Sequence, residues 1–355
     1  MTASIKDCLE LRLLVDVLYD IQDVRMRTEN RLRQMPKETS KVYSKPLRDT
    51  EDRLTLQIEG NLAKFPIYTD WLYNVKGIGP RISGSIIAQT MIRFVTVEAE
   101  EYETMTKSHA EHDAQTNFAS QNGCDTQFPY ASQPGGDAQS SLASQETTGT
   151  QFTCAFSPEQ LELAQKTEKG NYLVPTIRGI GAFDTVSKYW AWWGLDVRDG
   201  HAPKRIKGEN IDWNPKMRTL SWKIAKQFVM QGDRYRMIYD AEKLRLTAER
   251  IGEGGELYCP HLAECQAKLT RRDKPACKGH IDAMAKRKSV KLFLSHLWEK
   301  WRELEGLPVR QPYVIERMGH TTKQEPDQPE HEFATGKVKD AKVTEEKDKQ
   351  EPDST

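Results

Sequence analysis

Apolar residues recur at three- and four-residue steps near the start of the chain, a spacing typical of amphipathic helices. The first stripe predicts a helix over residues 4–34, which ends at Met35-Pro36 because proline disfavours helical geometry in the residue before it. A second stripe predicts a helix over residues 46–64. Two such helices with a short polar link form an antiparallel hairpin or coiled-coil arm, here residues 1–68. We expect the arm to pack on the rest of the chain or to form a homo-oligomer.

A glycine-rich turn follows the arm. An apolar run over residues 71–75 leads into Lys76-Gly77-Ile78-Gly79-Pro80-Arg81, after which helical spacing resumes to about residue 94. Glycines permit positive φ and close backbone approach, proline suits the first position of a helix, and the amides of a helix start bind anions. Because Lys76 and Arg81 bracket it, the turn predicts a helix-hairpin-helix that holds a nucleic-acid phosphate without reading bases. The alternative is an ordinary helix-loop-helix corner.

The middle of the chain loses this pattern. Residues 99–156 are rich in Gln, Ser, Thr, Ala and Gly, which predicts a disordered insertion. Helical patterns return over residues 157–168, and again after Asp184, which we expect to cap a helix that ends at Gly194. That second helix carries a cluster of three tryptophans, which either stack on bases or fill a core or an interface.

Later segments again predict helices, at residues 215–230, 233–250 and 281–305. Between Lys188 and Lys223 there are eight Lys and Arg residues against four Asp and Glu. Such a local excess of positive charge is typical of phosphate binding. From residue 309 onward a short extended segment gives way to a charged tail without apolar periodicity, which predicts disorder.

Composition limits the functional classes. The 355 residues include 52 Lys and Arg and 52 Asp and Glu, so nucleic-acid binding has to rest on local patches and not on net charge. No stretch resembles a signal peptide or a membrane span, and we expect no membrane partner. Six cysteines at irregular positions do not indicate a disulfide framework, and we expect a reducing cytoplasmic location.

Three cysteines and one histidine between residues 259 and 280 predict a metal site. Cys259 and Cys265 form one short-spaced pair, and Cys277 and His280 form a second. Structural zinc takes four tetrahedral sulfur or nitrogen ligands in this kind of arrangement. His261 is an alternative ligand, and incidental thiols are the alternative interpretation of the cysteines. We expect a structural zinc that fixes the start of the following helix.

The order of these motifs resembles a known family. Trp71-Leu72 precedes the glycine turn, Thr185-Val186-Ser187 precedes Trp190-Ala191 and Gly194-Leu195, and a basic loop containing Gly200 leads to Pro215-Lys216-x-Arg218. This series resembles the C-terminal transposase domain of the bridge-RNA insertion-sequence transposases, over residues 9–246 with 99–156 inserted. Those recombinases join a RuvC-like DEDD nuclease domain, through a coiled-coil arm, to this domain. The resemblance implies DNA or structured RNA as a partner.

Two departures bear on catalysis. Only the arm-like helices precede Trp71, so the family's nuclease domain is not found. The family also places a nucleophilic serine in the loop after the Gly-Leu pair, whereas no serine or threonine lies between Leu195 and Lys216. We therefore predict a DNA-binding protein without catalysis of its own. The alternatives are an active recombinase whose catalytic acids come from a partner, and a helical scaffold for protein contacts.

The predicted fold is mainly α, with an arm, a helical domain that contains the helix-hairpin-helix, and a small zinc-stapled helical module. The predicted segments are 1–68 for the arm, 69–98 with 157–250 for the transposase-like domain, 99–156 for the insertion, 251–308 for the zinc module and 309–355 for the tail. The predicted nucleic-acid contacts are Lys76, Gly77, Ile78, Gly79, Arg81, Arg198, Lys204, Arg205, Lys207, Lys216 and Arg218. The predicted metal ligands are Cys259, Cys265, Cys277 and His280.

Overall fold

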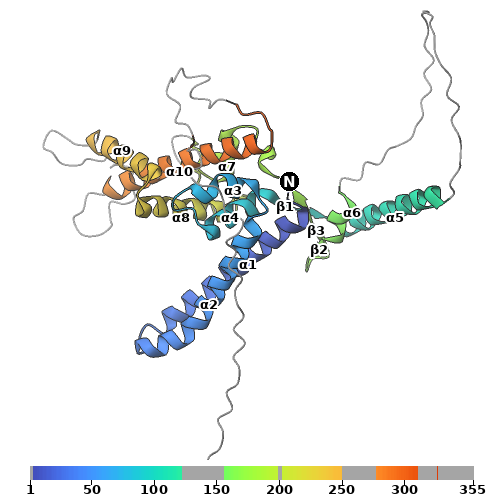
Figure 1. The fold of residues 1–355 in the computed structure, drawn as a ribbon, viewed down its shortest axis with the longest axis horizontal. Coiled ribbons are helices and arrows are strands. Elements are labelled where there is room, and N and C mark those ends of the chain that lie inside the picture. Colours follow the sequence, from blue (N-terminus) through green and yellow to red (C-terminus); the bar gives the residue numbers. More distant parts are fainter. Residues whose placement is uncertain (1–2, 122–155, 199–201, 250–276, 311–325, 327–355) are drawn as a thin grey trace, which may run out of the picture. The chain divides into compact units, whose positions relative to one another are not determined.

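A computed structural model describes residues 3–121, 156–198, 202–249, 277–310 and 326 (Figure 1). The described residues are mainly helical, which confirms the predicted class. They divide into two compact units, one formed by Met1–Ile92 with Arg178–Thr355 and the other by Arg93–Ile177. No helix among the described residues is both long and apolar enough to cross a membrane.

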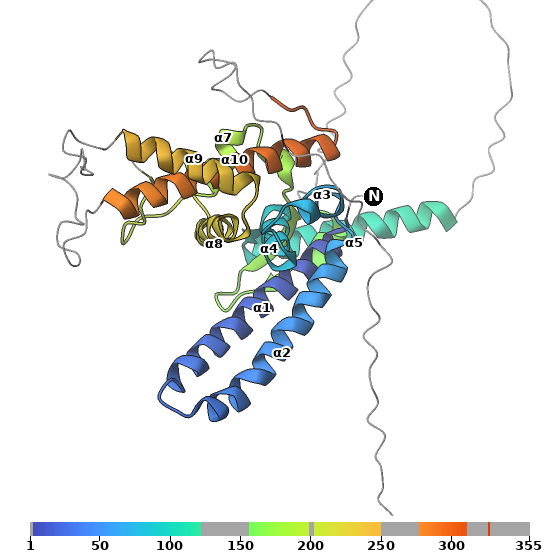
Figure 2. The same ribbon diagram turned by 60° about the vertical axis from the view of Figure 1, so that its left-hand side comes forward.

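The arm is an antiparallel pair of helices, α1 (Ile5–Arg31) and α2 (Lys37–Leu62), which lie side by side in both ribbon views (Figure 2). Ser4 caps α1, because its side chain accepts from the Asp7 amide while the Asp7 carboxylate accepts from the Ser4 amide. The predicted start of the second helix at Pro46 is wrong, since α2 begins at Lys37 and contains Pro46 in its interior. Proline removes one hydrogen bond there without ending the helix.

The turn region follows directly, as α3 (Pro66–Asp70), η1 (Leu72–Asn74) and α4 (Pro80–Met91). Both arm helices pack on α4. Gly84 is the point of closest approach, because a Cβ built there would lie 2.8 Å from Ile58 Cγ2 and 3.2 Å from Val15 Cγ2. The arm is thus held on α4 by packing that only glycine allows at this position.

The rest of the first unit consists of η2 (Ile180–Ala182), α7 (Val186–Trp192), α8 (Pro215–Gln231), α9 (Arg234–Ala248) and α10 (Cys277–Leu304). α10 is the central element and packs on α3, α7, α8 and α9. Its Phe293 is fully buried and lies against Trp71 and Phe228, with ring centroids 5.8 and 5.3 Å away. Aromatic contacts therefore join the turn region, α8 and α10 into one core.

The second unit contains a small sheet that the sequence patterns did not predict. Strands β1 (Ile92–Val97), β2 (Gln165–Lys166) and β3 (Tyr172–Ile177) lie in the order β1-β3-β2, and β2 pairs antiparallel with β3. The helix predicted over residues 157–168 is shorter, because α6 (Pro158–Glu162) ends before β2. β1 and β3 are six-residue runs that alternate imperfectly and β2 has two residues, so the three strands carry little periodic signal in the sequence.

The predicted disorder of residues 99–156 is wrong for its first part. Residues Ala99–Gln121 form α5, and residues 122–155 lie outside the described ranges. Tyr102 fixes the helix start, since its ring stacks on Tyr172 at 3.8 Å and its hydroxyl donates to the Leu161 carbonyl at 2.7 Å. Contacts with partners some sixty residues away thus order a segment whose own composition does not favour a fold.

Candidate nucleic-acid interface

The glycine turn lies between η1 and α4, and its two glycines differ. Gly77 has φ of 90°, and a Cβ there would lie 3.3 Å from Gln231 Cγ and 3.4 Å from Gln227 Cβ. Gly79 has φ of −80° and an added Cβ would meet nothing within 4 Å. Ile78 between them is buried. The turn therefore needs one glycine for its backbone and its contact with α8, whereas Gly79 leaves room above the start of α4.

The amides at the start of α4 are partly used within the turn. The Ile82 and Ser83 amides both donate to the Gly79 carbonyl at 3.0 Å, and Pro80 has no amide hydrogen. Fewer donors then face outward than at a typical helix start, where the first amides lack partners. The anion site expected from backbone amides is correspondingly weaker than the sequence predicts.

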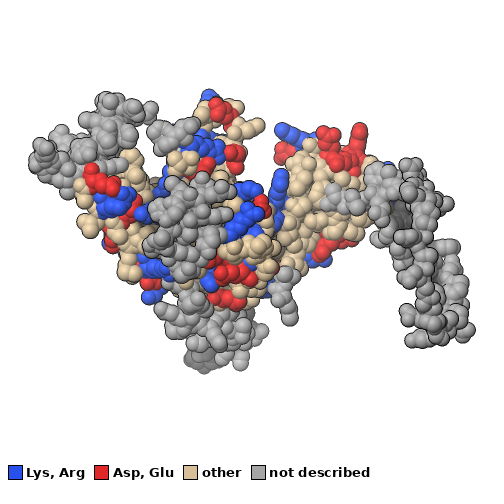
Figure 3. Space-filling model, turned by 90° about the horizontal axis from the view of Figure 1, so that it is seen from above, with Lys and Arg blue, Asp and Glu red and all other residues tan. Residues whose placement is uncertain are grey.

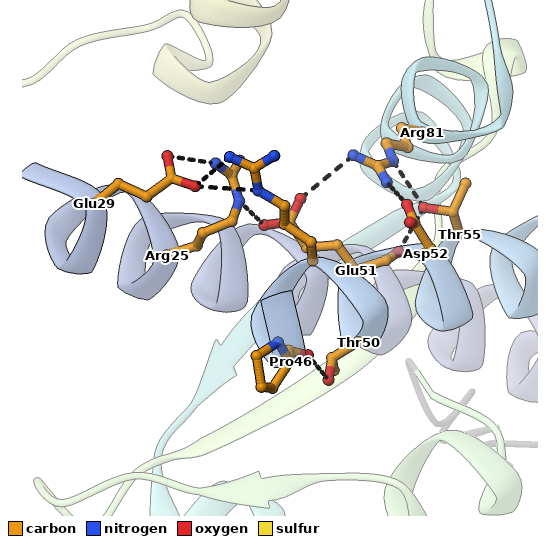
Figure 4. A network of polar contacts seen from close by, with 9 residues as sticks. Arg25, Glu29, Pro46, Thr50, Glu51, Asp52, Thr55 and Arg81 are labelled. Atoms are coloured by element: carbon orange, nitrogen blue, oxygen red, sulfur yellow. Dashed lines mark hydrogen bonds and ion pairs between the residues drawn. The ribbon is translucent and has the colours of Figure 1, made fainter. Parts of the chain in front are cut away.

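Arg81 points onto the arm (Figure 4). Its Nε donates to Thr55 Oγ1 at 2.7 Å, and its terminal nitrogens lie 3.0 Å from Asp52 Oδ1 and 3.5 Å from Glu51 Oε2. The Glu51 side chain is only 5% exposed and also accepts from Arg25 Nε at 2.5 Å. Arg81 thus closes a network of ion pairs between α4 and the arm, and in this arrangement its charge is already balanced.

Lys76, on the other side of the turn, remains accessible. Its side chain is 64% exposed, and its Nζ lies 3.8 Å from Asp233 Oδ2 at the start of α9. An exposed pair at that distance contributes little free energy, so Lys76 can exchange Asp233 for a phosphate at low cost.

The basic loop between α7 and α8 is closed at its base. Arg198 lies 2.6 Å from Asp196 and 2.8 Å from Asp212, and both carboxylates raise the pKa of its guanidinium. Lys204, Arg205 and Lys207 are exposed and form no ion pair with the described residues. Of the predicted loop contacts, these three present unbalanced charge, whereas Arg198 is structural.

Arg218 and Lys216 at the start of α8 also have partners. Arg218 donates to the carbonyl of Gly194 and lies over the Trp213 ring, 5.5 Å from its centroid. Burial lowers the pKa of this guanidinium. Lys216 Nζ lies 2.9 Å from Asp16 on α1. Arg218 therefore stabilises the C-terminal end of α7, where carbonyls lack helical partners, and Lys216 ties α8 to the arm.

The α7 helix itself packs as core. Thr185 caps it by accepting from the Lys188 amide, and the predicted cap Asp184 instead pairs with Lys188 Nζ at 2.6 Å. Trp193 is fully buried, and Trp190 Nε1 donates to the Lys291 carbonyl at 3.0 Å. Trp193 thus fills the interior of this unit, while Trp190 and Trp192 are half-buried.

A second arginine at the end of α7 comes from α10 and completes its capping. Arg287 donates to the Leu195 carbonyl at 2.8 Å and to the Asp196 carbonyl. Burial lowers the pKa of Arg287, and it lowers that of Lys291, one turn further along α10, to about 8. Arg218, Arg287 and Lys291 are therefore three cations at buried or half-buried positions. Arg218 and Arg287 bond to carbonyls, and Lys291 Nζ lies 4.0 Å from the centroid of the Trp190 ring.

The exposed face of α8 carries further charge without a carboxylate partner among the described residues. This helix of 17 residues contains four Lys and Arg and no Asp or Glu. Most of its exposed positions follow one stripe. The exposed positions are Pro215, Lys216, Thr219, Trp222, Lys223, Lys226, Met230 and Gln231. Neither Lys223 nor Lys226 forms an ion pair with a described residue, although Lys223 Nζ lies 4.3 Å from the centroid of the Tyr19 ring.

The two ends of α8 meet the two predicted basic elements. Its last turn contacts Gly77 through Gln227 and Gln231, and its first residue follows the base of the loop at Asp212–Asn214. At 1.5 Å per residue, positions 216 and 227 are about 16 Å apart along the helix. The turn and the base of the loop therefore do not form one compact site. Each lies at one end of α8, and the exposed residues of the helix lie between these ends.

On the molecular surface, Lys and Arg side chains form several patches separated by acidic and uncharged residues (Figure 3). This distribution agrees with the zero net charge of the chain. The α8 face was missed in the sequence because Lys223 was counted with a wider basic segment that ended there, which left Lys226 out. The signal that could have found it is the absence of acids from a whole amphipathic helix.

The predicted zinc site lies mostly outside the described residues. Cys259, His261 and Cys265 fall in that part of the chain, whereas Cys277 and His280 occupy the first turn of α10. The described residues contain no group of three or more His, Cys, Asp and Glu side chains placed to hold a metal. Positions three apart share one face of a helix, so Cys277 and His280 have the spacing of a ligand pair.

The chain matches no protein-family model, no curated protein and no solved structure.

Proposed function

We propose that this protein binds nucleic acid through its phosphates, along the exposed face of α8. The observation that carries the proposal is an acid-free helix with two unbalanced lysines, Lys223 and Lys226, at its centre. Lys76 extends this strip at one end, and Lys204, Arg205 and Lys207 belong to the loop at the other. We use the name α8 strip for these six residues.

The length of the strip suits a nucleic-acid backbone. A helix of 17 residues is about 25 Å long, and phosphates of one strand follow at about 3.4 Å along the axis of B-DNA. The helix is thus as long as about seven phosphates of one strand, more than its cations can contact. Cations without base-reading partners give affinity without sequence preference.

Other elements of the sequence analysis belong to the same proposal. A transposase-like origin accounts for the order arm, glycine turn, tryptophan helix and basic loop, with DNA or structured RNA in the cytoplasm as the ligand and a homo-oligomer formed through the arm. A structural zinc held by Cys259, Cys265, Cys277 and His280 would fix the first turn of α10. Catalysis is not part of this proposal.

The salt dependence of binding tests it. Affinity of the full chain for a fluorescent DNA duplex is measured from low to physiological salt, with Lys223→Ala/Lys226→Ala as the variant. Each lost phosphate contact lowers the slope of log affinity against log salt by about 0.9, so the double variant should lose about 1.8. Lys41→Ala/Lys45→Ala, two exposed lysines on α2, is the matched control and should keep the wild-type slope.

An unchanged slope in the α8 variant would sink the proposed surface. Equal losses in both double variants would show that binding follows total charge and not the strip.

Metal content of the purified protein, measured in parallel with a Cys259→Ser/Cys265→Ser variant, tests the proposed zinc site. The expected result is one bound zinc in the wild type and none in the variant.

A further inference from the structure

Trp222 is unlike the other tryptophans of this chain. Its side chain is 60% exposed, whereas the remaining seven are buried or half-buried, at positions 71, 190, 192, 193, 213, 298 and 301. Trp222 lies in the middle of the α8 strip, between the two ends that carry the turn and the loop. Burying an indole is strongly favourable, so a tryptophan left in water here is not explained by the packing of α8.

The surroundings of the indole are polar and basic. Lys286 Nζ on α10 lies 5.4 Å from the centroid of the ring and is held there by Asp282 at 2.7 Å. Along α8, Arg218, Thr219 and Lys226 occupy the positions one turn away and are therefore its neighbours on the helix surface. An apolar docking partner would have to cover these charged side chains as well. A flat aromatic ligand with attached phosphates matches both the ring and Lys226, whereas Lys286 is paired with Asp282 and Arg218 is bonded to the Gly194 carbonyl.

We propose that Trp222 stacks on an unpaired nucleobase whose flanking phosphates are held by Lys223 and Lys226. This inference rests on the proposed function and specifies its ligand as a single-stranded segment, in DNA or RNA. Bases inside a duplex present no free face, so only an unpaired base can stack on a side chain. Stacking of this kind changes affinity by about 5- to 100-fold per base and depends little on base identity.

The test compares single and double strands on the same variants. The full chain is titrated with a 12-nucleotide oligothymidylate, the matching oligouridylate and a 12-base-pair duplex, using labelled strands. Trp222→Ala should weaken binding of a single strand about 10-fold or more and duplex binding less than about 2-fold. Trp222→Phe keeps an aromatic face and should recover most of the loss. Tyr43→Ala, which removes an aromatic ring that is 59% exposed on the arm, is the matched control and should change nothing.

The outcomes separate the two levels of the proposal. A larger loss with oligothymidylate identifies DNA and a larger loss with oligouridylate identifies RNA, and either supports stacking. Equal weakening of single strands and duplex by Trp222→Ala, with no recovery in Trp222→Phe, overturns stacking while the phosphate strip stands. A wild-type protein that binds duplex but neither single strand also overturns it. If Lys223→Ala/Lys226→Ala leaves every ligand bound as before, the proposed function itself fails.

Discussion

Arg81 and Lys226 belong to the same unit, and only Arg81 was predicted from the sequence to contact phosphate, yet the fold gives the two cations opposite surroundings. Arg81 is met by Asp52 at 3.0 Å, by Glu51 at 3.5 Å and by the Thr55 hydroxyl at 2.7 Å, all from α2. Lys226 lies on a helix without acids and has no carboxylate partner among the described residues. Whether a cation is available for phosphate is decided here by the carboxylates that the fold brings to it.

The difference has an energetic basis. To reach a phosphate, Arg81 would have to give up Asp52 and Thr55 and leave the buried Glu51 carboxylate to Arg25 alone, which weakens the compensation of a buried charge. Lys226 gives up only water and mobile ions, whose release favours phosphate binding. We therefore expect the arm network to contribute to stability and the α8 strip, under the proposed function, to contribute to binding. Four pairs of variants sharpen this comparison.

The largest expected effect is on the arm side. Arg25→Met leaves Glu51, which is 5% exposed, with Arg81 as its remaining ionic partner, and should lower the free energy of unfolding by about 3 kcal/mol. Chemical denaturation followed by circular dichroism measures it. Arg27→Met, from an exposed pair with Asp23, is the control and should cost less than about 0.5 kcal/mol. Similar small losses in both would mean that the arm network is no more than a surface feature.

The glycine turn comes next. Gly77→Ala forces a side chain into φ of 90° against Gln227 and Gln231, which should cost about 1–2 kcal/mol. Gly79→Ala meets no atom and removes freedom from the unfolded chain, so it should be neutral or stabilise by up to about 1 kcal/mol. Thermal unfolding of the two variants side by side gives the answer. If both alanines destabilise equally, the distinction drawn between these glycines is wrong.

These glycines also show how far sequence reasoning reaches. Among the signals that act within one turn of the chain, the predicted cap Asp184 of α7 is wrong, because Thr185 caps that helix. The start of α8 at Pro215 and the turn at Gly194, with φ of 66°, were predicted correctly. Each depends only on the local backbone, so the residue type is informative by itself. Gly79 was expected to need glycine because of its place in a motif, and its backbone shows that it does not.

Features that depend on distant partners could not be predicted in this way. The Arg81–Glu51 pair joins residues thirty positions apart, and the Tyr102–Tyr172 stack that starts α5 joins residues seventy positions apart. Neither contact leaves a periodic trace in the sequence. The candidate site shows the same limit, because a count of charges found the basic region but could not tell Lys223 from Arg218, whose guanidinium stabilises the end of α7.

Substitution of Lys226 and of Arg81 should have a smaller effect, which concerns the affinity for nucleic acid alone. Lys226→Gln removes one phosphate contact and should weaken duplex binding about 5-fold near physiological salt, with a slope lower by about 0.9. Arg81→Gln should change affinity less than about 2-fold, because its charge is already balanced by the arm. Fluorescence anisotropy on both proteins, after a check that each unfolds at its expected temperature, decides the matter. An equal loss for Arg81→Gln would restore the glycine turn as the main phosphate site.

The smallest expected effect is on the pH dependence of stability and concerns α10, where Lys288, like Arg81, has a carboxylate partner. Glu242 on α9 accepts from Arg245 at 2.7 Å and lies 2.7 Å from Lys288, and these bonds lower its pKa to about 2. A carboxyl whose pKa is lower in the folded state stabilises the fold above its unfolded pKa, near 4.5, and this contribution is lost as pH falls towards about 2. Arg245 and Lys288 are both largely exposed, so solvent screening reduces the contribution to about 0.5–1 kcal/mol.

Glu242→Gln should therefore flatten the fall in stability between pH 4.5 and pH 2, measured by urea denaturation. Glu303→Gln, on the exposed pair with Lys300, is the control and should follow the wild type. A wild-type profile for Glu242→Gln would show that carboxylates do not balance the α10 lysines, and Lys288 would then join Lys226 as a candidate phosphate contact.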